Sequence, residues 1–272
     1  MDDCAVHSSG FEQHIKHLGV TLTKFREAGL TLKLSKASFA KPTIKFLGNM
    51  VGSGIRTPVF DKVQAIREIP EPRTKKEMTS FLGAVNYFRG YIPRMSDIAY
   101  PLTELTRTAA KMKFALNDIE RQAFHKLKLA LCEATALQSP QYSAPFIIHT
   151  DASNVACGAS LSQLDEGTGK ARPIAFVSQK FSKTQQNWST IEREAYALIY
   201  ALKQFAYFIF LTPFDITCYC DHNPLSYLTQ AAAKSPKLLR WSLSLSRYPL
   251  IIKHIKGVEN EMADLLSRSY VE

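Results

Sequence analysis

The sequence predicts an α/β protein, with a mainly helical first half followed by a mixed sheet in the order βββαβαβα. Apolar residues recur at helical spacing in several segments before Pro140, whereas apolar and alternating strand-like segments begin directly after it. The chain has 272 residues, of which 46% are hydrophobic, so one or two domains can each bury a core.

The first half begins with a predicted helix over residues 11–28, which carries one apolar stripe that we expect to be buried. Gly29 follows it as a C-terminal stop. Two strands are predicted next, over residues 31–35 and 44–51, and the turn at residues 52–54 closes this small β-rich region.

Helices are predicted over residues 62–69, 74–92 and 118–134. Thr74 with Glu77 three residues later is typical of a helix N-terminus. Within the second of these helices, helical spacing favours core positions for three aromatic residues over roles in base stacking: Tyr87, Phe88 and Tyr91.

The second half contains the elements of the predicted sheet. Strands are expected at residues 145–153, 158–164, 172–179, 214–221 and 250–257, and helices at 188–209, 235–247 and 260–268. The first three strands follow one another through turn-rich sequence, so we expect them to be antiparallel. In mixed sheets, functional sites lie at strand ends.

Charge indicates a polyanionic partner. The net charge is +10, and residues 1–140 carry 21 Lys and Arg against 13 Asp and Glu, a net charge of +8. Nucleic acid is the first candidate, because Lys and Arg release condensed counterions when they neutralise phosphates. Residues 141–272 carry 13 against 11, and acidic residues there indicate bound cations.

The five cysteines lack the paired spacing of a zinc site or a disulfide framework. No stretch reaches the roughly 18 apolar residues of a membrane span, and the N-terminus lacks a signal pattern. We therefore expect a reduced protein inside the cell, cytoplasmic or nuclear, that is neither secreted nor bound to a membrane.

Four acidic residues stand beside predicted element boundaries, and they form the candidate metal site: Asp151, Glu192, Asp221 and Asp264. Carboxylate oxygens suit Mg²⁺ or Mn²⁺, and four of them can hold two ions against a phosphodiester. Each residue alone also fits an ordinary structural role, because Asp is common in turns and at helix starts. Their joint placement predicts phosphodiester hydrolysis.

The long helix offers two glutamates, and helix geometry places Glu192 and Glu194 on different faces. Only one of the two can enter the metal site, and Glu192 is the candidate. Glu194 is then expected to be a solvated partner of a basic residue.

Four collinear blocks cover almost the whole chain: FLGNMV, the long segment from KVQAIREIP to PLTEL, PFIIHTDAS and ENEMADLLSR. In this order they resemble the reverse transcriptase and ribonuclease H segments of Ty3/gypsy-type retroelement polyproteins. The resemblance implies three regions: residues 1–55 as a remnant of the polymerase palm, 56–140 as a thumb-like helical region, and 141–272 as a ribonuclease H-like domain.

The resemblance makes Asp2 and Asp3 the end of the polymerase x-D-D signature, whereas a lone acidic pair at a chain end is usually solvated. Nucleotidyl transfer also needs a carboxylate from an earlier palm segment, which has no counterpart before Met1. We therefore expect the polymerase site to be incomplete in this chain. The family is nevertheless that of RNA-directed DNA polymerases.

For the third region, residues 141–272, the resemblance implies a nuclease that uses two Mg²⁺ or Mn²⁺ ions to cleave the RNA strand of RNA–DNA hybrids. The family pattern also places the helical acid three residues before the Ala that starts the apolar run, which selects Glu192 before Ala195. His254, ten residues before Asp264, takes the place of a mobile residue that transfers protons or helps the product leave. Six basic residues are candidate contacts to the nucleic-acid backbone: Lys75, Lys76, Arg89, Arg94, Arg107 and Arg240.

Two alternatives stay open. The same fold can serve as an inactive or host-adopted module that binds nucleic acid or protein. A strand-transfer enzyme of the integrase type shares the sheet but has no early helical glutamate, so Glu192 argues against it. Expected partners are an RNA–DNA hybrid or another nucleic acid, and also a second copy of the chain or the remaining Pol segments.

Overall fold

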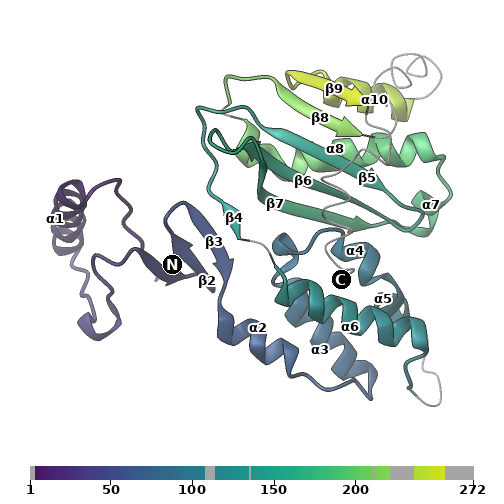
Figure 1. Cartoon of the computed structure of the whole chain (residues 1–272), viewed down its shortest axis with the longest axis horizontal. Helices are drawn as coiled ribbons and strands as arrows, with labels where there is room; N and C mark the ends of the chain where they lie inside the picture. Colours follow the sequence, from purple (N-terminus) through teal and green to yellow (C-terminus); the bar gives the residue numbers. More distant parts are fainter. Residues whose placement is uncertain (1–3, 108–113, 135, 211, 221–235, 255–272) are drawn as a thin grey trace. The chain divides into compact units, whose positions relative to one another are not determined.

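The protein, seen in a computed structural model, divides into two compact units, residues 1–59 and 60–272 (Figure 1). The structure describes residues 4–107, 114–134, 136–210, 212–220 and 236–254. The division lies close to the boundary expected after residue 55. Residues 60–272, which include most of the expected thumb-like region and the whole nuclease region, form one unit.

The first unit contains one long helix and a small antiparallel sheet. Its elements are α1 (Phe11–Glu27), the 3₁₀ helix η1 (Leu34–Lys36), β1 (Thr43–Phe46), β2 (Asn49–Gly52) and β3 (Ile55–Pro58). Helix α1 ends before Gly29, whose φ of +68° confirms the predicted stop. The expectation of a buried stripe is wrong for this unit, because α1 buries no residue.

Two strand predictions in this unit are corrected. Residues 31–35 form no strand, and part of that segment is η1. The single strand expected over residues 44–51 is a hairpin, in which β1 and β2 flank a turn at Leu47 and Gly48. Both turn residues have positive φ, 44° and 76°, which matches the right-handed twist of a two-residue hairpin. Because Leu seldom adopts a positive φ, its presence at the first turn position gives no sequence signal for this turn.

The second unit begins with helices. They are α2 (Phe60–Arg67), α3 (Lys75–Asn86), the 3₁₀ helix η2 (Arg89–Tyr91), α4 (Met95–Ile98), α5 (Tyr100–Arg107) and α6 (Asp118–Cys132). The Thr74 hydroxyl accepts a hydrogen bond from the Glu77 amide at 3.1 Å, as predicted. At α6, Asn117 and Glu120 form a reciprocal capping box. The predicted helix over 74–92 stops at Asn86.

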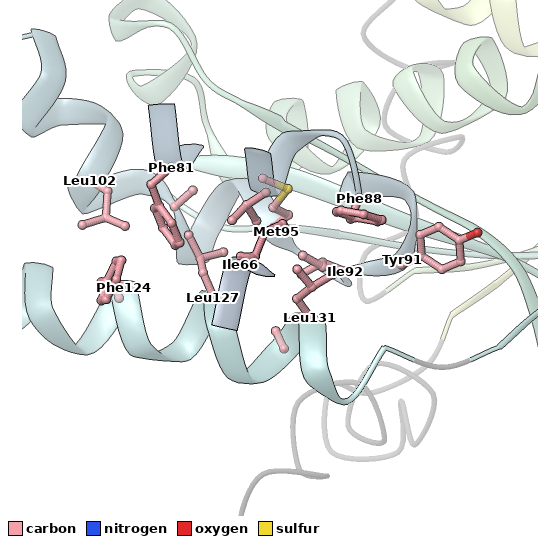
Figure 2. Close-up of a cluster of buried hydrophobic side chains, with 14 of the residues drawn as sticks. Ile66, Phe81, Phe88, Tyr91, Ile92, Met95, Leu102, Phe124, Leu127 and Leu131 are labelled. Carbon is pink, nitrogen blue, oxygen red and sulfur yellow. The ribbon is translucent and has the colours of Figure 1, made fainter. Parts of the chain in front are cut away.

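These helices share one hydrophobic core, drawn in Figure 2. Phe81 and Phe124 lie at its centre, with ring centroids 4.5 Å apart. Phe88 and Tyr91 are buried, which confirms their predicted core positions, but Tyr87 is 53% exposed and the prediction for it is wrong. Tyr87 is the C-cap residue of α3 and stands between the buried Val85 and Phe88, so it falls outside the spacing of the core positions.

The sheet of this unit has the strand order β7-β6-β5-β8-β9. Its strands are β5 (Ile147–Ala152), β6 (Ala156–Leu164), β7 (Ala171–Lys180), β8 (Ile216–Cys220) and β9 (Leu250–His254), and the short β4 (Leu137–Gln138) precedes them. The first three strands are antiparallel, as predicted, whereas β5–β8 and β8–β9 pair in parallel.

Among the described residues, the helices that accompany these strands are α7 (Lys183–Gln186), α8 (Thr190–Ile209) and α10 (Pro236–Leu245). The order of strands and long helices confirms the predicted mixed sheet up to β9. The last predicted helix, over residues 260–268, lies outside the described residues.

Residues on opposite faces of the sheet pack in different hydrophobic cores. Ile148 and Leu161 pack with α8 and α10, whereas Phe176 of β7 joins the core of the helical region. The opposite face is also tied to the helices by polar contacts, since both the amide and the hydroxyl of Ser96 donate to the Ser178 hydroxyl. The sheet is therefore covered by α8 on one face and by the helical region on the other, around β6 and β7 (Figure 1).

The cysteines carry free thiols, as expected. Cys157, Cys218 and Cys220 are buried, and burial raises the pKa of Cys157 and of Cys218 to about 12. Among the helices that the structure describes, none combines the length and the apolar character needed to span a membrane.

Candidate active site

Asp151 lies near the end of β5, the central strand of the sheet, which pairs with β6 along its length and with β8 over residues 147–149. Its register partner on β6 is Gly158, which has no side chain to cover the carboxylate. The Asp151 side chain remains 32% exposed. A strand-end carboxylate in the middle of a sheet is thus accessible from outside, as the sequence predicts.

Glu194 reaches the same strand end from α8. Its Oε1 accepts a hydrogen bond from the backbone amide of Ala152, the residue after Asp151, at 3.1 Å. The residue is only 1% exposed, so its expected role as a solvated surface partner is wrong. Asp151 on β5 and Glu194 on α8 therefore reach the same strand end from two separate elements.

Glu192 is used differently. Its Oε2 accepts hydrogen bonds from the amide and the hydroxyl of Ser189, and the Glu192 amide donates back to that hydroxyl, which completes the N-terminal capping box of α8. Its Oε1 pairs with Lys237 at 2.8 Å. The structure thus places the two glutamates differently: Glu194 accepts from the backbone amide next to Asp151, and Glu192 caps the N-terminus of α8.

Lys237 fixes this arrangement on the outside of α8. Its Nζ lies 3.8 Å from the ring centroid of Trp188 and 4.7 Å from that of Trp241, in addition to its ion pair with Glu192. Burial raises the pKa of Glu192, but hydrogen bonds from Lys237 and Ser189 outweigh it, so the net pKa is lowered. Glu192 stays charged in a structural contact between α8 and α10.

The sequence contained a signal for Glu194. The buried residues of α8 recur four, seven, eight and eleven positions after it, at Leu198, Ala201, Leu202 and Phe205. Glu194 therefore heads the stripe that faces the sheet. The distance of Glu192 from Ala195 does not identify the inward face of α8, whereas this periodicity does.

Asp151 also contacts a basic residue of the helical region, Arg94, which lies immediately before α4. Arg94 Nη1 lies 2.7 Å from Asp151 Oδ2, and Arg94 Nε lies 3.3 Å from Asp97 Oδ2. Asp97 in turn accepts a hydrogen bond from the hydroxyl of Ser153, which follows β5. These residues, which sequence reasoning did not connect with the site, join α4 to the end of β5.

A small hollow lies beside this ion pair, and its lining includes Asp151, His149, Ser160 and Phe176. His149 stacks on Tyr219, with ring centroids 4.9 Å apart. Burial lowers the pKa of His149 to about 4, so its imidazole is neutral at neutral pH. Among the residues that line this hollow, the charged side chains are therefore those of Asp151 and Arg94.

Several predicted site residues lie outside the described residues: Asp2, Asp3, Asp221 and Asp264. His254 is described, and it is the exposed last residue of β9. Its register partner is Cys220, the residue that precedes Asp221. His254 is thus close in register to one predicted ligand.

The predicted nucleic-acid contacts fall into different environments. Lys75, Lys76, Arg107 and Arg240 are exposed. Arg89 donates a hydrogen bond to the backbone carbonyl of Ser178, which ties η2 to β7, and Arg94 is held by Asp151 and Asp97.

The described residues fit part of a divalent-metal site. No group of three or more His, Cys, Asp or Glu within the described ranges could hold a metal ion. Asp151 and Glu194 nevertheless supply oxygen donors of the kind that Mg²⁺ and Mn²⁺ prefer. The Arg94 guanidinium already provides a stand-in cation on Asp151.

Comparison with known proteins agrees with this architecture. Residues 141–248 match the model of an RNase H-like domain found in reverse transcriptase. The Pol polyproteins of the transposons 297 and opus of Drosophila melanogaster are 37% and 36% identical, over 100% and 98% of this chain. The Tf2-3 polyprotein of Schizosaccharomyces pombe is 32% identical over 98% of it.

These matches cover 25%, 27% and 20% of the respective polyproteins, so the chain spans about a quarter of the length of its curated relatives or less. Two solved structures of a foamy viral protease-reverse transcriptase share the fold. The complex with an RNA/DNA hybrid has a TM-score of 0.76 and 23% identity, over 93% of this chain and 34% of that one. The complex with dsDNA has a TM-score of 0.71 and 23% identity, over 90% of this chain and 51% of that one.

The fold and the match over residues 141–248 define an RNase H-like domain of the kind found in reverse transcriptase. Its homologues are Pol polyproteins of Ty3/gypsy-type retrotransposons. The family resemblance predicted from the sequence is confirmed.

Proposed function

We propose that this chain is a metal-dependent endonuclease that cleaves the RNA strand of RNA–DNA hybrids, as part of a retroelement RNA-directed DNA polymerase. The observation that carries the proposal is that Glu194 reaches the strand end of Asp151, where it accepts from the Ala152 amide. A second carboxylate is held at this strand end although burying Glu194 is costly. Such an arrangement favours a cation-binding role over a purely structural one.

In this proposal Asp151 and Glu194 hold divalent ions together with Asp221 and Asp264, and Glu194 replaces Glu192 in the predicted set. Two bound Mg²⁺ or Mn²⁺ ions would activate the attacking water and stabilise the departing oxygen. The Ala152 amide orients Glu194 by its hydrogen bond. Loss of that orientation should weaken metal binding even where all carboxylates remain.

His254 is proposed to give a proton to the departing 3′-oxygen, a step worth about 10²–10⁴-fold in general acid catalysis. Its exposure on the last position of β9 leaves the imidazole free to move. Cleavage would leave 3′-hydroxyl and 5′-phosphate ends. Contacts to 2′-hydroxyl groups would select the RNA strand.

The exposed residues Lys75, Lys76, Arg107 and Arg240 are proposed to contact the backbone of the hybrid. The foamy viral enzyme of similar fold has been captured both with an RNA/DNA hybrid and with dsDNA, which supports a nucleic-acid partner. The net charge of +10 agrees with it. We further propose residues 56–140 as the thumb-like region and 1–55 as the palm remnant.

The test compares a labelled RNA–DNA hybrid with duplex DNA in Mg²⁺, using the full chain and its Asp151→Asn variant. Asn keeps the shape of the side chain and removes the charge that attracts cations. Cleavage of RNA in the hybrid alone, lost in the variant, supports the proposal. Equal cleavage by both proteins would refute the role of Asp151, binding without cleavage would indicate an inactive module, and DNA joining would indicate strand transfer.

A further inference from the structure

Arg94 is held in an unusual backbone conformation next to the proposed metal ligand. Its φ of +48° lies in the left-handed region, which residues other than glycine seldom adopt. It stands immediately before α4, and from there its guanidinium reaches Asp151 at 2.7 Å and Asp97 at 3.3 Å. The surrounding structure must stabilise this strained position.

Asp97 and Ser153 provide that support. The Ser153 hydroxyl donates to Asp97 and accepts from the amides of Val155 and Ala156 at 3.2 and 3.0 Å. Asp97 therefore has a fixed position beside the end of β5, and it directs the guanidinium toward Asp151. The Arg94 guanidinium thus contacts Asp151 through Nη1 and Asp97 through Nε.

Three carboxylates act on this guanidinium. Burial lowers the pKa of Arg94, but the charges of Asp151, Asp97 and Glu194 outweigh it and raise that pKa. The guanidinium is permanently charged in any case. One positive charge thus lies within the field of both described carboxylates of the proposed metal site.

A divalent cation that binds Asp151 has to compete with this arrangement. The cation would use carboxylate lone pairs that now accept from Arg94, and the two positive groups would repel each other at short range. Binding of the cation must therefore displace the guanidinium or share Asp151 with it at lower affinity. Either way, the free energy of the Arg94–Asp151 pair opposes metal binding.

We propose that Arg94 takes the place of a metal ion on Asp151. Its guanidinium neutralises the Asp151 carboxylate in the metal-free protein and gives up this contact when a divalent ion binds. The helical region thereby lowers the metal affinity of the nuclease site. This inference rests on the proposed function, because it takes Asp151 as a metal ligand. It assigns Arg94 a positioning role that differs from the backbone contact expected from the sequence.

Calorimetric titration with Mn²⁺, in the absence of nucleic acid, tests the proposal on the full chain. Arg94→Met should bind Mn²⁺ roughly tenfold more tightly than the wild type, since it removes both the competition and the repulsion. The matched control is Lys126→Met, which removes one positive charge from an exposed position on α6 and should leave the affinity unchanged. The gain in Arg94→Met should shrink at high ionic strength.

A double-mutant cycle identifies the residue through which Arg94 acts. Arg94→Met should give no increase in affinity when Asp151 is already Asn, because the effect requires the Asp151 charge. A similar gain in both backgrounds would overturn the proposal. Weaker hybrid binding in Arg94→Met without any change in Mn²⁺ affinity would also overturn it, since Arg94 would then be a backbone contact only.

A measurement on the wild type covers the case in which Arg94→Met does not fold. Arginine side-chain NMR during a Mg²⁺ titration should show hindered rotation of the Arg94 guanidinium without metal and faster rotation with it. An unchanged Arg94 signal at saturating Mg²⁺ would refute displacement, while hybrid cleavage would leave the proposed function intact. Absence of Mn²⁺ binding to both wild type and Arg94→Met would refute the proposed function and this inference with it.

Discussion

Glu194 accepts a hydrogen bond from the amide of Ala152 at 3.1 Å, which joins the inward face of α8 to the strand end that carries Asp151. Glu192, only two residues earlier, lies in the N-terminal cap of the same helix and pairs with Lys237. The two side chains have the same chemistry and differ in the face of the helix from which they project. This contrast allows a direct comparison of matched variants.

Glu194→Gln should reduce hybrid cleavage by about 10³-fold, because a metal ligand supports several kcal/mol of transition-state stabilisation. Glu192→Gln should retain cleavage and lower the free energy of unfolding by about 1 kcal/mol, through its weakened cap and ion pair. Cleavage rates and urea denaturation of both variants provide the measurement. The opposite pattern, with activity lost only in Glu192→Gln, would restore the original assignment.

Glu104 of α5 and Lys180 of β7 form an ion pair at 2.7 Å that ties the helical region to the sheet. The hydrogen bond from Lys180 lowers the pKa of Glu104 below its usual 4.5. A lowered folded-state pKa contributes stability that is present above pH 4.5 and is lost as the pH falls through the folded-state value.

Glu104→Gln should therefore destabilise the protein at pH 7 by at most about 1 kcal/mol, since solvent screens a carboxylate that is this exposed. It should have a smaller effect below pH 4. Urea denaturation across this pH range measures the difference, with Glu133→Gln at an exposed position as the control for loss of charge. A destabilisation that is independent of pH would exclude the ion pair as its cause.

Phe88 and Tyr87 are neighbours in the sequence with opposite environments, 2% and 53% exposed. Phe88→Ala should lower the free energy of unfolding by about 3–5 kcal/mol, because it leaves a cavity in the core of the helical region. Tyr87→Ala should cost less than about 1 kcal/mol. Thermal or urea denaturation measures both, and equal losses would contradict the packing in Figure 2.

The free thiols should differ in reactivity. Cys4 and Cys132 are exposed and should be alkylated by iodoacetamide in the native protein, whereas Cys157, Cys218 and Cys220 are buried and should react only after unfolding. Mass spectrometry of peptides from native and urea-unfolded protein measures this difference. Fast native labelling of Cys218 would mean that β8 is less protected than its burial indicates.

Local sequence patterns were sufficient for most of the second unit. The spacing of apolar residues predicted α6 and α8, and alternation predicted β5, β6 and β7, because each pattern reflects burial of one face of a regular element. The capping residue Thr74 was identified because its hydrogen bond is local. Strand prediction failed in the first unit, where Leu47 adopts a positive φ that is unusual for its side chain.

The sequence by itself determined the order of the elements, the family and the position of Asp151 at a strand end. The periodicity of α8 marks Glu194 as inward-facing, but only the tertiary structure shows that this face meets the strand end of Asp151, because that depends on how α8 packs on the sheet. It alone also brought Arg94 to Asp151, across 57 positions of the sequence (151 − 94). Periodicity is a local property of the chain, whereas contacts between distant charges arise only when the elements pack together.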